Sequence, residues 1–153
     1  MPGTLKRFFE LLDGPTAERS LDMLSQDLRF SILFSNGPGE ARDFAGGRDE
    51  FDAYMAQRGA PAWTHHVLAE LVDGDLEVAF GETRRDGSAL ASFVAAIKLD
   101  ADGRISRYIV GRSPAVLFEH EPAASPSGAS SGAAGLPPQQ SAVGPTAQAA
   151  VRR

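Results

Sequence analysis

Two adjacent histidines are the clearest chemical signal in this sequence. His65 and His66 lie in a strand-like segment, and a neutral imidazole can act as a base at about pH 7. Neighbouring strand residues point to opposite faces, so at most one histidine should line a pocket, and the two cannot converge on one metal ion. Apolar spacing places His65 on the face of Trp63, Val67 and Leu71. A hydrogen-bonded structural histidine is the alternative for either residue.

The surrounding residues predict an antiparallel meander that would hold these groups. Three strand-like runs between residues 64 and 112 are joined by the turn sequences Asp86-Gly87 and Asp100-Ala101-Asp102-Gly103. Short Gly-containing turns between alternating apolar runs are strong hairpin signals. The meander is therefore expected to form one wall of a cup.

The two turns also predict a register. If Arg85 faces Ser88 and Leu99 faces Arg104, every second residue of each strand has a fixed neighbour on the next strand. Because side chains alternate along a strand, four layers of such neighbours should share one face. They are Leu76-Ile97-Ser106, Val78-Ala95-Tyr108, Phe80-Phe93-Val110 and Glu82-Ala91-Arg112. That face is apolar at its centre and ends in an acid and a base.

The layers suggest roles for residues on this face. Phe80 and Phe93 would give a ligand its apolar contact area, as in most small-molecule sites. Glu82 and Arg112 flank the small Ala91, so they are expected to form a salt bridge that orients a polar group at the mouth of the cup. A solvated structural pair that contributes about 0–1 kcal/mol is the alternative.

Upstream of the meander, the sequence predicts three helices and one strand. Apolar residues recur at helical spacing over Leu5–Leu12, a second short helix lies around residues 21–24, and a third spans Arg48–Gln57. Leu28–Ser35 is rich in strand formers, and Trp63–Val72 leads into the meander. This order predicts an α+β protein with its helices on one face of a curved sheet.

Composition limits the class of protein. The chain has 153 residues, 42% of them hydrophobic, and no apolar run long enough to cross a membrane. A net charge of −5 argues against nucleic acid and anionic membranes as partners. The absence of cysteine excludes disulfides and a cysteine nucleophile. The amphipathic N-terminus favours a cytoplasmic location, and the richness in alanine and arginine is typical of a GC-rich bacterial genome.

The composition changes at Glu119. From there to Arg153 the chain consists mainly of Ala, Ser, Gly, Pro and Gln, which cannot form a core. We therefore expect one domain over residues 1–118 and a disordered tail over residues 119–153.

Three short motifs resemble the SnoaL-like branch of the nuclear transport factor 2-like superfamily. Gly47-Arg48-Asp49-Glu50-Phe51 opens the third helix, Val72-Asp73-Gly74-Asp75 turns between strands, and Asp102-Gly103-Arg104-Ile105 opens the last strand. The resemblance covers about residues 4–118. It implies a cone-shaped α+β fold, in which three helices of the N-terminal half cover the concave face of a curved mixed or antiparallel sheet, as in cystatin-like rolls. It also implies a homodimer through the outer sheet face, where the outward residues would be Ala79, Gly81, Thr83, Val94 and Ala96.

Members of this superfamily include ketosteroid isomerases, polyketide cyclases, scytalone dehydratases, epoxide hydrolases and non-enzymatic binding domains. Where this chain resembles the isomerases, Phe8, Ile32 and Ala95 replace their tyrosine donor, aspartate base and second acidic donor. Removal of a carbonyl-adjacent proton needs such groups, so steroid isomerisation is not expected. Arg112-Ser113-Pro114 stands where an Asp-Pro pair is frequent, which weakens the cyclase and epoxide hydrolase interpretations.

The resemblance also selects site residues. The Thr-X-His segment of scytalone dehydratases is similar to residues 64–66, which implies that His66 faces the cup as acid or base. Tyr108 lies beside Ala95 in the predicted register, so its hydroxyl would reach the space of an isomerase acid. Tyr54 matches a pocket aromatic of relatives. A buried tyrosine that bonds one polar partner for structural reasons is the alternative.

Two functions remain open at this stage. The first is a cofactor-independent cyclase, isomerase or dehydratase that acts on a small carbonyl or aromatic compound. The second is a non-catalytic module that binds a small apolar molecule with a polar end, or a protein, through the same cup. Neither needs a metal or other cofactor. The predicted catalytic residues are His66 and Tyr108, and the predicted substrate-binding residues are Tyr54, Phe80, Glu82, Phe93 and Arg112.

Overall fold

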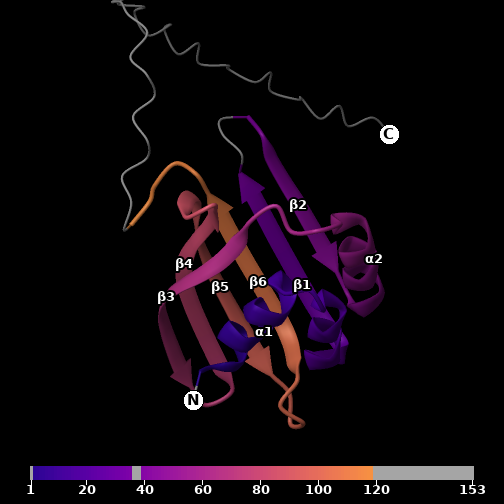
Figure 1. The fold of residues 1–153 in the computed structure, drawn as a ribbon. Helices are drawn as coiled ribbons and strands as arrows, with labels where there is room; N and C mark the ends of the chain where they lie inside the picture. Colours follow the sequence, from indigo (N-terminus) through magenta and orange to yellow (C-terminus); the bar gives the residue numbers. More distant parts are fainter. Residues whose placement is uncertain (1, 36–38, 119–153) are drawn as a thin grey trace, which may run out of the picture.

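The computed structural model describes residues 2–35 and 39–118, which form one mixed sheet with helices against one face (Figure 1). The sheet order is β2-β1-β6-β5-β4-β3; β1 and β6 are parallel, and the other neighbours are antiparallel. The predicted tail, residues 119–153, lies outside the described residues. The elements are α1 (Thr4–Asp13), the 3₁₀ helix η1 (Ala17–Met23), β1 (Leu24–Ser35), β2 (Ala41–Gly46), α2 (Arg48–Arg58), β3 (Thr64–Asp73), β4 (Leu76–Arg85), β5 (Ser88–Leu99) and β6 (Ile105–Ser113).

α1 lies across the sheet and contacts β3 and β4 (Figure 1). Its four apolar residues at helical spacing over Leu5–Leu12 are buried, as the sequence pattern predicts. The Glu77 carboxylate of β4 accepts hydrogen bonds from the backbone N–H groups of Thr4 (3.1 Å) and Leu5 (2.8 Å). This contact fixes the first turn of α1, because helix N-termini have unpaired N–H groups and favour negative charge. Within the described residues, no helix is long and apolar enough to span a membrane.

One strand was not predicted from the sequence. β2 pairs with the second half of β1, from Phe30 opposite Gly46 to Ser35 opposite Ala41. Most of its side chains are exposed, and its sequence Ala-Arg-Asp-Phe-Ala-Gly lacks β-branched residues. An edge strand of this kind is held mainly by backbone pairing, so it has little hydrophobic pattern to detect. α2 contacts both strands and covers this side of the sheet.

The predicted register of the meander is wrong except beside the first turn. Arg85 does face Ser88, but a bulge between Thr83 and Arg84 then shifts the pairing of β4 with β5 by one residue. In the second hairpin Leu99 faces Ile105 instead of the predicted Arg104, and an irregularity between Lys98 and Leu99 then shifts β5 against β6 by one further residue. A bulge adds a residue without changing the turn sequence, so turn chemistry alone did not reveal it.

As a result, Phe93 lies opposite Gly81 and Arg112 instead of opposite Phe80 and Val110. Gly81 permits this approach, because a Cβ there would overlap the His66 carbonyl oxygen and lie 2.9 Å from the Phe93 ring. Because of the shift, the residues of β4 that were predicted to face inward face outward, and those predicted to face outward face inward.

The inner face of β4 carries the buried residues Glu77, Ala79, Gly81 and Thr83. The predicted layers had instead placed Leu76, Val78, Phe80 and Glu82 on this face. Ala79, Gly81 and Thr83 therefore do not belong to the outer surface, whereas Val94 and Ala96 do. The outer face instead presents large apolar side chains that are 39–74% exposed, namely Leu33, Leu71, Val78, Val94 and Ile109.

Candidate functional site

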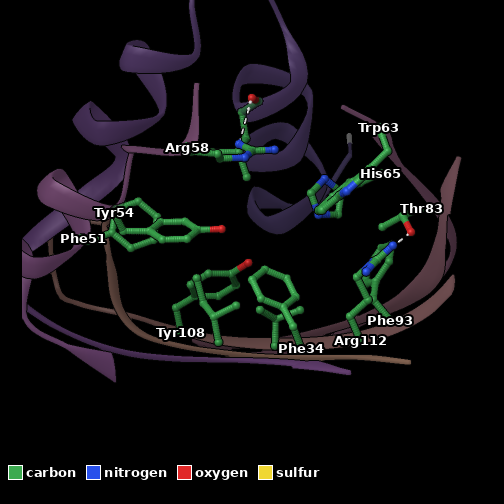
Figure 2. A pocket seen from close by; sticks show the side chains of 13 residues that line it. Phe34, Phe51, Tyr54, Arg58, Trp63, His65, Thr83, Phe93, Tyr108 and Arg112 are labelled. Carbon is green, nitrogen blue, oxygen red and sulfur yellow. Dashed lines mark hydrogen bonds between the residues drawn. The ribbon is translucent and has the colours of Figure 1, made fainter. Parts of the chain in front are cut away.

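A narrow pocket opens between the helices and the inner face of the sheet (Figure 2). The space between its lining atoms is about 400 Å³, part of it open to solvent, but the centre of a water molecule has only about 20 Å³ available. A ligand must therefore be slim or must displace a lining side chain. The lining is mostly aromatic and aliphatic: Leu12, Ile32, Phe34, Phe51, Tyr54, Arg58, Trp63, His65, Thr83, Phe93, Tyr108, Val110 and Arg112.

His65 lines one side of this pocket and is hydrogen-bonded to Asp13, which supports it without lining the pocket itself. Asp13, the last residue of α1, accepts hydrogen bonds from the backbone N–H of His65 and, at 2.9 Å, from its Nδ1. The His65 ring is stacked on Phe9 with centroids 4.2 Å apart. The side chains of His65 and Asp13 are about nine-tenths buried, with exposures of 6% and 10%. Asp13 thus fixes the ring orientation and favours the tautomer that carries its proton on Nδ1.

The environment keeps this imidazole neutral. Burial lowers the pKa of His65, and the nearby Arg58 and Arg112 act in the same direction, while the hydrogen bond and charge of Asp13 oppose them. In the described part of the chain, Nε2 of His65 has no hydrogen-bond partner, although it is not sealed from solvent. A neutral ring with a free Nε2 lone pair at a pocket wall can accept a proton from a bound molecule.

Two phenols face this histidine from the other side. Figure 2 shows the hydroxyl groups of Tyr54 and Tyr108 pointing into the pocket and toward each other. Burial raises the pKa of each, so both keep their protons at neutral pH. Neither hydroxyl has a hydrogen-bond partner among the described residues, and neither is sealed. Because buried tyrosines normally find a polar partner, these two donors are available to a ligand.

Two guanidinium groups flank Trp63 at the mouth. Arg112 lies over its ring at 4.9 Å and donates from Nε to Thr83 Oγ1 at 3.1 Å. Arg58, at the end of α2, lies 5.6 Å from the same ring, and its Nη2 is 3.8 Å from Asp13. These contacts hold both cations beside an aromatic surface.

The structure brings four of the seven predicted site residues to the pocket: Tyr54, Phe93, Tyr108 and Arg112. It places the other three elsewhere. His66 is exposed on the outer face, where its Nε2 lies 3.0 Å from Thr64 Oγ1. The prediction of His66 was wrong because His65 pairs with the inward Thr83, and His66 pairs with the outward Glu82.

Phe80 and Glu82 also lie on the outer face, because of the shift between β4 and β5. Phe80 packs edge-on against Phe118, with centroids 4.7 Å apart. Glu82 is buried and accepts hydrogen bonds from Arg84 at 3.1 and 3.2 Å. The predicted bridge between Glu82 and Arg112 is therefore wrong, since the two residues occupy opposite faces.

Among the polar residues and tryptophan that line or support the pocket, the predicted site did not include Asp13, Arg58, Trp63, His65 and Thr83. The apolar spacing of β3 did place His65 and Trp63 on one face, and that signal was correct. Asp13 and Arg58 end their helices and carry no local pattern that distinguishes them from solvated charges. In the described residues, no group of three histidine, aspartate or glutamate side chains could hold a metal ion.

Comparisons of sequence give no relative. No family profile matches the chain, and no curated protein matches it.

Comparison of structure does find similar folds. One is a candidate isomerase of the SnoaL-like family from Agrobacterium tumefaciens, with a TM-score of 0.53 and 14% identity over 71% of this chain and 93% of that one. Another is a candidate polyketide cyclase from Sinorhizobium meliloti, with a TM-score of 0.51 and 18% identity over 72% and 94%. A third is an NTF-2 like protein of unknown function from Burkholderia xenovorans, with a TM-score of 0.54 and 15% identity over 76% and 84%.

These neighbours show that the chain has the nuclear transport factor 2-like fold, an α+β cone with an open mixed sheet. The predicted fold class is confirmed. At this level of identity the likeness concerns the fold alone, and the chemistry must come from the site.

Proposed function

We propose that this protein binds a small, flat, largely apolar molecule with one polar end and catalyses a proton transfer on it, as a cofactor-independent isomerase, dehydratase or cyclase would. The observation that carries the proposal is a set of polar atoms around an aromatic pocket that have no hydrogen-bond partner among the described residues: His65 Nε2, the Tyr54 and Tyr108 hydroxyls and the Arg112 Nη groups. Such convergence in an apolar pocket is typical of small-molecule sites.

His65 is the proposed base in place of His66. Its Nε2 takes a proton from carbon next to a substrate carbonyl, and the electron pair of the broken C–H bond moves onto the carbonyl oxygen. The Tyr54 and Tyr108 hydroxyls donate hydrogen bonds to that oxygen, and Asp13 stabilises the imidazolium through Nδ1. Return of the proton from Nε2 to another carbon of the enolate completes an isomerisation. In a dehydration the enolate electrons re-form the carbonyl and a C=C bond as the C–O bond at the β-carbon breaks, and the proton passes from Nε2 to the departing hydroxyl, which leaves as water.

The second candidate is a non-catalytic binding module with the same pocket. The absence of the isomerase groups at Phe8, Ile32 and Ala95 favours it, since Phe8 and Ala95 are core residues and Ile32 lines the pocket. The narrowness of the pocket also favours it. Both candidates require ligand contacts on the inner face and differ only in proton transfer.

The test separates binding from chemistry. Amide chemical shifts are mapped with acetophenone and phenylpyruvate on wild type, His65→Gln and His66→Gln, and exchange of the ligand α-protons is followed in D₂O. We expect shifts at the lining residues, and faster exchange in wild type and His66→Gln than in His65→Gln. Shifts at the pocket without accelerated exchange favour the binding module. Shifts confined to the outer face overturn the pocket proposal.

The proposal includes a homodimer formed through the outer sheet face. Rows of apolar residues on adjacent strands support it: Leu71, Val78 and Ile109 lie in one row across the sheet, and Val94 and Leu33 in the next. Exposed apolar areas of this kind are typical of interfaces. Light scattering should give a dimer for wild type and a monomer for Ile109→Asp, and a wild-type monomer at micromolar concentration would refute it.

A cytoplasmic location also belongs to the proposal and is tested by cell fractionation.

A further inference from the structure

We propose that the polar end of the ligand is a carboxylate and that Arg112 holds it. This inference rests on the proposed function, because it assigns the chemistry of a molecule in the same pocket. It is carried by the balance of charge at the pocket, by the geometry of Arg112 and by the shape of the space in front of it.

The charges of the lining do not balance. Arg58 and Arg112 are its two fixed cations, and no acid is among the lining residues. The carboxylate nearest the lining, Asp13, already bonds His65 and lies 3.8 Å from Arg58. Within the described residues, no acidic group lies within ion-pair distance of Arg112, whose hydrogen-bond and cation–π partners there are Thr83 and Trp63. The pocket therefore has one cation more than its carboxylates neutralise.

Arg112 is also held in a fixed orientation. Its Nε is occupied by Thr83, and its planar group lies over Trp63. The two Nη groups donate to no described residue and are not sealed from solvent. A guanidinium fixed at Nε still offers parallel N–H donors from its terminal groups, which match the two oxygens of a carboxylate.

The surroundings make an anion favourable at this point. Burial and, after it, the nearby Arg85 lower the pKa of Arg112, because its charged form lacks electrostatic compensation from the described residues around it. An anion would supply it. The narrow aromatic space favours a flat carboxylate joined to a planar body over a tetrahedral anion such as phosphate.

The experiment uses the single tryptophan of the chain as a reporter, because Trp63 lines the pocket beneath Arg112. Its fluorescence is titrated with two acid and amide pairs, benzoate against benzamide and phenylacetate against phenylacetamide, and with inorganic phosphate. The proteins are wild type, Arg112→Gln and Arg107→Gln. Arg107 is the matched control, because it lies on the same strand but away from the pocket and has the same charge. Thermal melts check that each variant is folded.

We expect the wild type to bind each acid roughly tenfold or more tightly than its amide, as hydrogen bonds to charged groups are stronger than neutral ones. Arg112→Gln should reduce that ratio to near one, and Arg107→Gln should retain it. If Arg112→Gln does not fold, the ratio of acid to amide affinity in wild type still decides whether the ligand is a carboxylate. If acids and amides bind equally well, the carboxylate inference is overturned and the proposed function still stands. The same conclusion follows if phosphate binds as tightly as phenylacetate. No response of Trp63 to any of the aromatic compounds in the millimolar range overturns both.

Discussion

Replacement of His65 by glutamine should change how the stability of this protein depends on pH. Burial of the imidazole lowers its pKa in the folded state, against the opposing effect of Asp13. The unfolded chain has the ordinary value of about 6.5. As the pH falls below that value, the unfolded state takes up a proton that the folded state does not bind, so acid destabilises the fold. This loss of stability does not occur at pH values well above the pKa of His65 in the unfolded chain. It stops increasing once the pH falls below the pKa of His65 in the folded protein.

The size of this effect has an upper limit. While only the unfolded state is protonated, the free energy of unfolding falls by about 1.4 kcal/mol per pH unit. Between about pH 7.5 and pH 5.5, His65 can therefore account for at most about 1.4 kcal/mol. The Gln variant cannot take up this proton and should lose correspondingly less stability. Its stability at pH 7.5 will be lower, because it lacks the ring that stacks on Phe9.

The assay is urea unfolding of wild type, His65→Gln and His66→Gln at several pH values over this range. Contributions of other titrating groups cancel when the curves are subtracted. His66→Gln removes the same atoms from the neighbouring, exposed residue and should retain the wild-type slope, since His65 is intact. If wild type instead gains stability relative to His65→Gln on acidification, then the attraction of Asp13 exceeds the desolvation, His65 is charged in the folded state, and it cannot serve as the proposed base.

Three further outcomes are expected. Gly81→Ala should lower the free energy of unfolding by about 1–3 kcal/mol or more, because its Cβ would overlap the His66 carbonyl oxygen and crowd Phe93; unchanged urea midpoints would contradict the close packing. Ketosteroid double-bond isomerisation should be absent or very slow, and efficient turnover in a standard absorbance assay would show that other groups supply the missing acids. Removal of residues 121–153 should leave the melting temperature within a few degrees, since that sequence has few large apolar residues; a larger fall would show that it docks.

The parts of the fold that follow local patterns could be predicted from the sequence. The buried face of α1 has helical periodicity, α2 follows Gly47 and ends one residue beyond the predicted Gln57, and the hairpins form at the predicted turns. These features depend on neighbours in the chain. β2 could not be predicted, because an edge strand held by backbone pairing needs no particular side chains.

The candidate site was predicted less well than the fold because it depends on long-range packing. His65 and Asp13 are 52 positions apart in the sequence, and no pattern near either residue indicates the other. The choice of His66 followed a three-residue resemblance. The apolar spacing of β3, which favours His65, reports directly which face is buried and was the better guide.

The bulge at Thr83 decides the electrostatics of the pocket as well as its lining. In an ideal hairpin Glu82 would face inward beside Arg112, and the two would neutralise each other at the mouth. The one-residue shift turns Glu82 to the outer face, where it pairs with Arg84, and brings Thr83 inward as the partner of Arg112 Nε. A neutral hydroxyl orients the guanidinium without cancelling its charge. The same irregularity that invalidates the predicted register therefore leaves a positioned cation in the pocket, and that cation is what makes an anionic ligand the expected one.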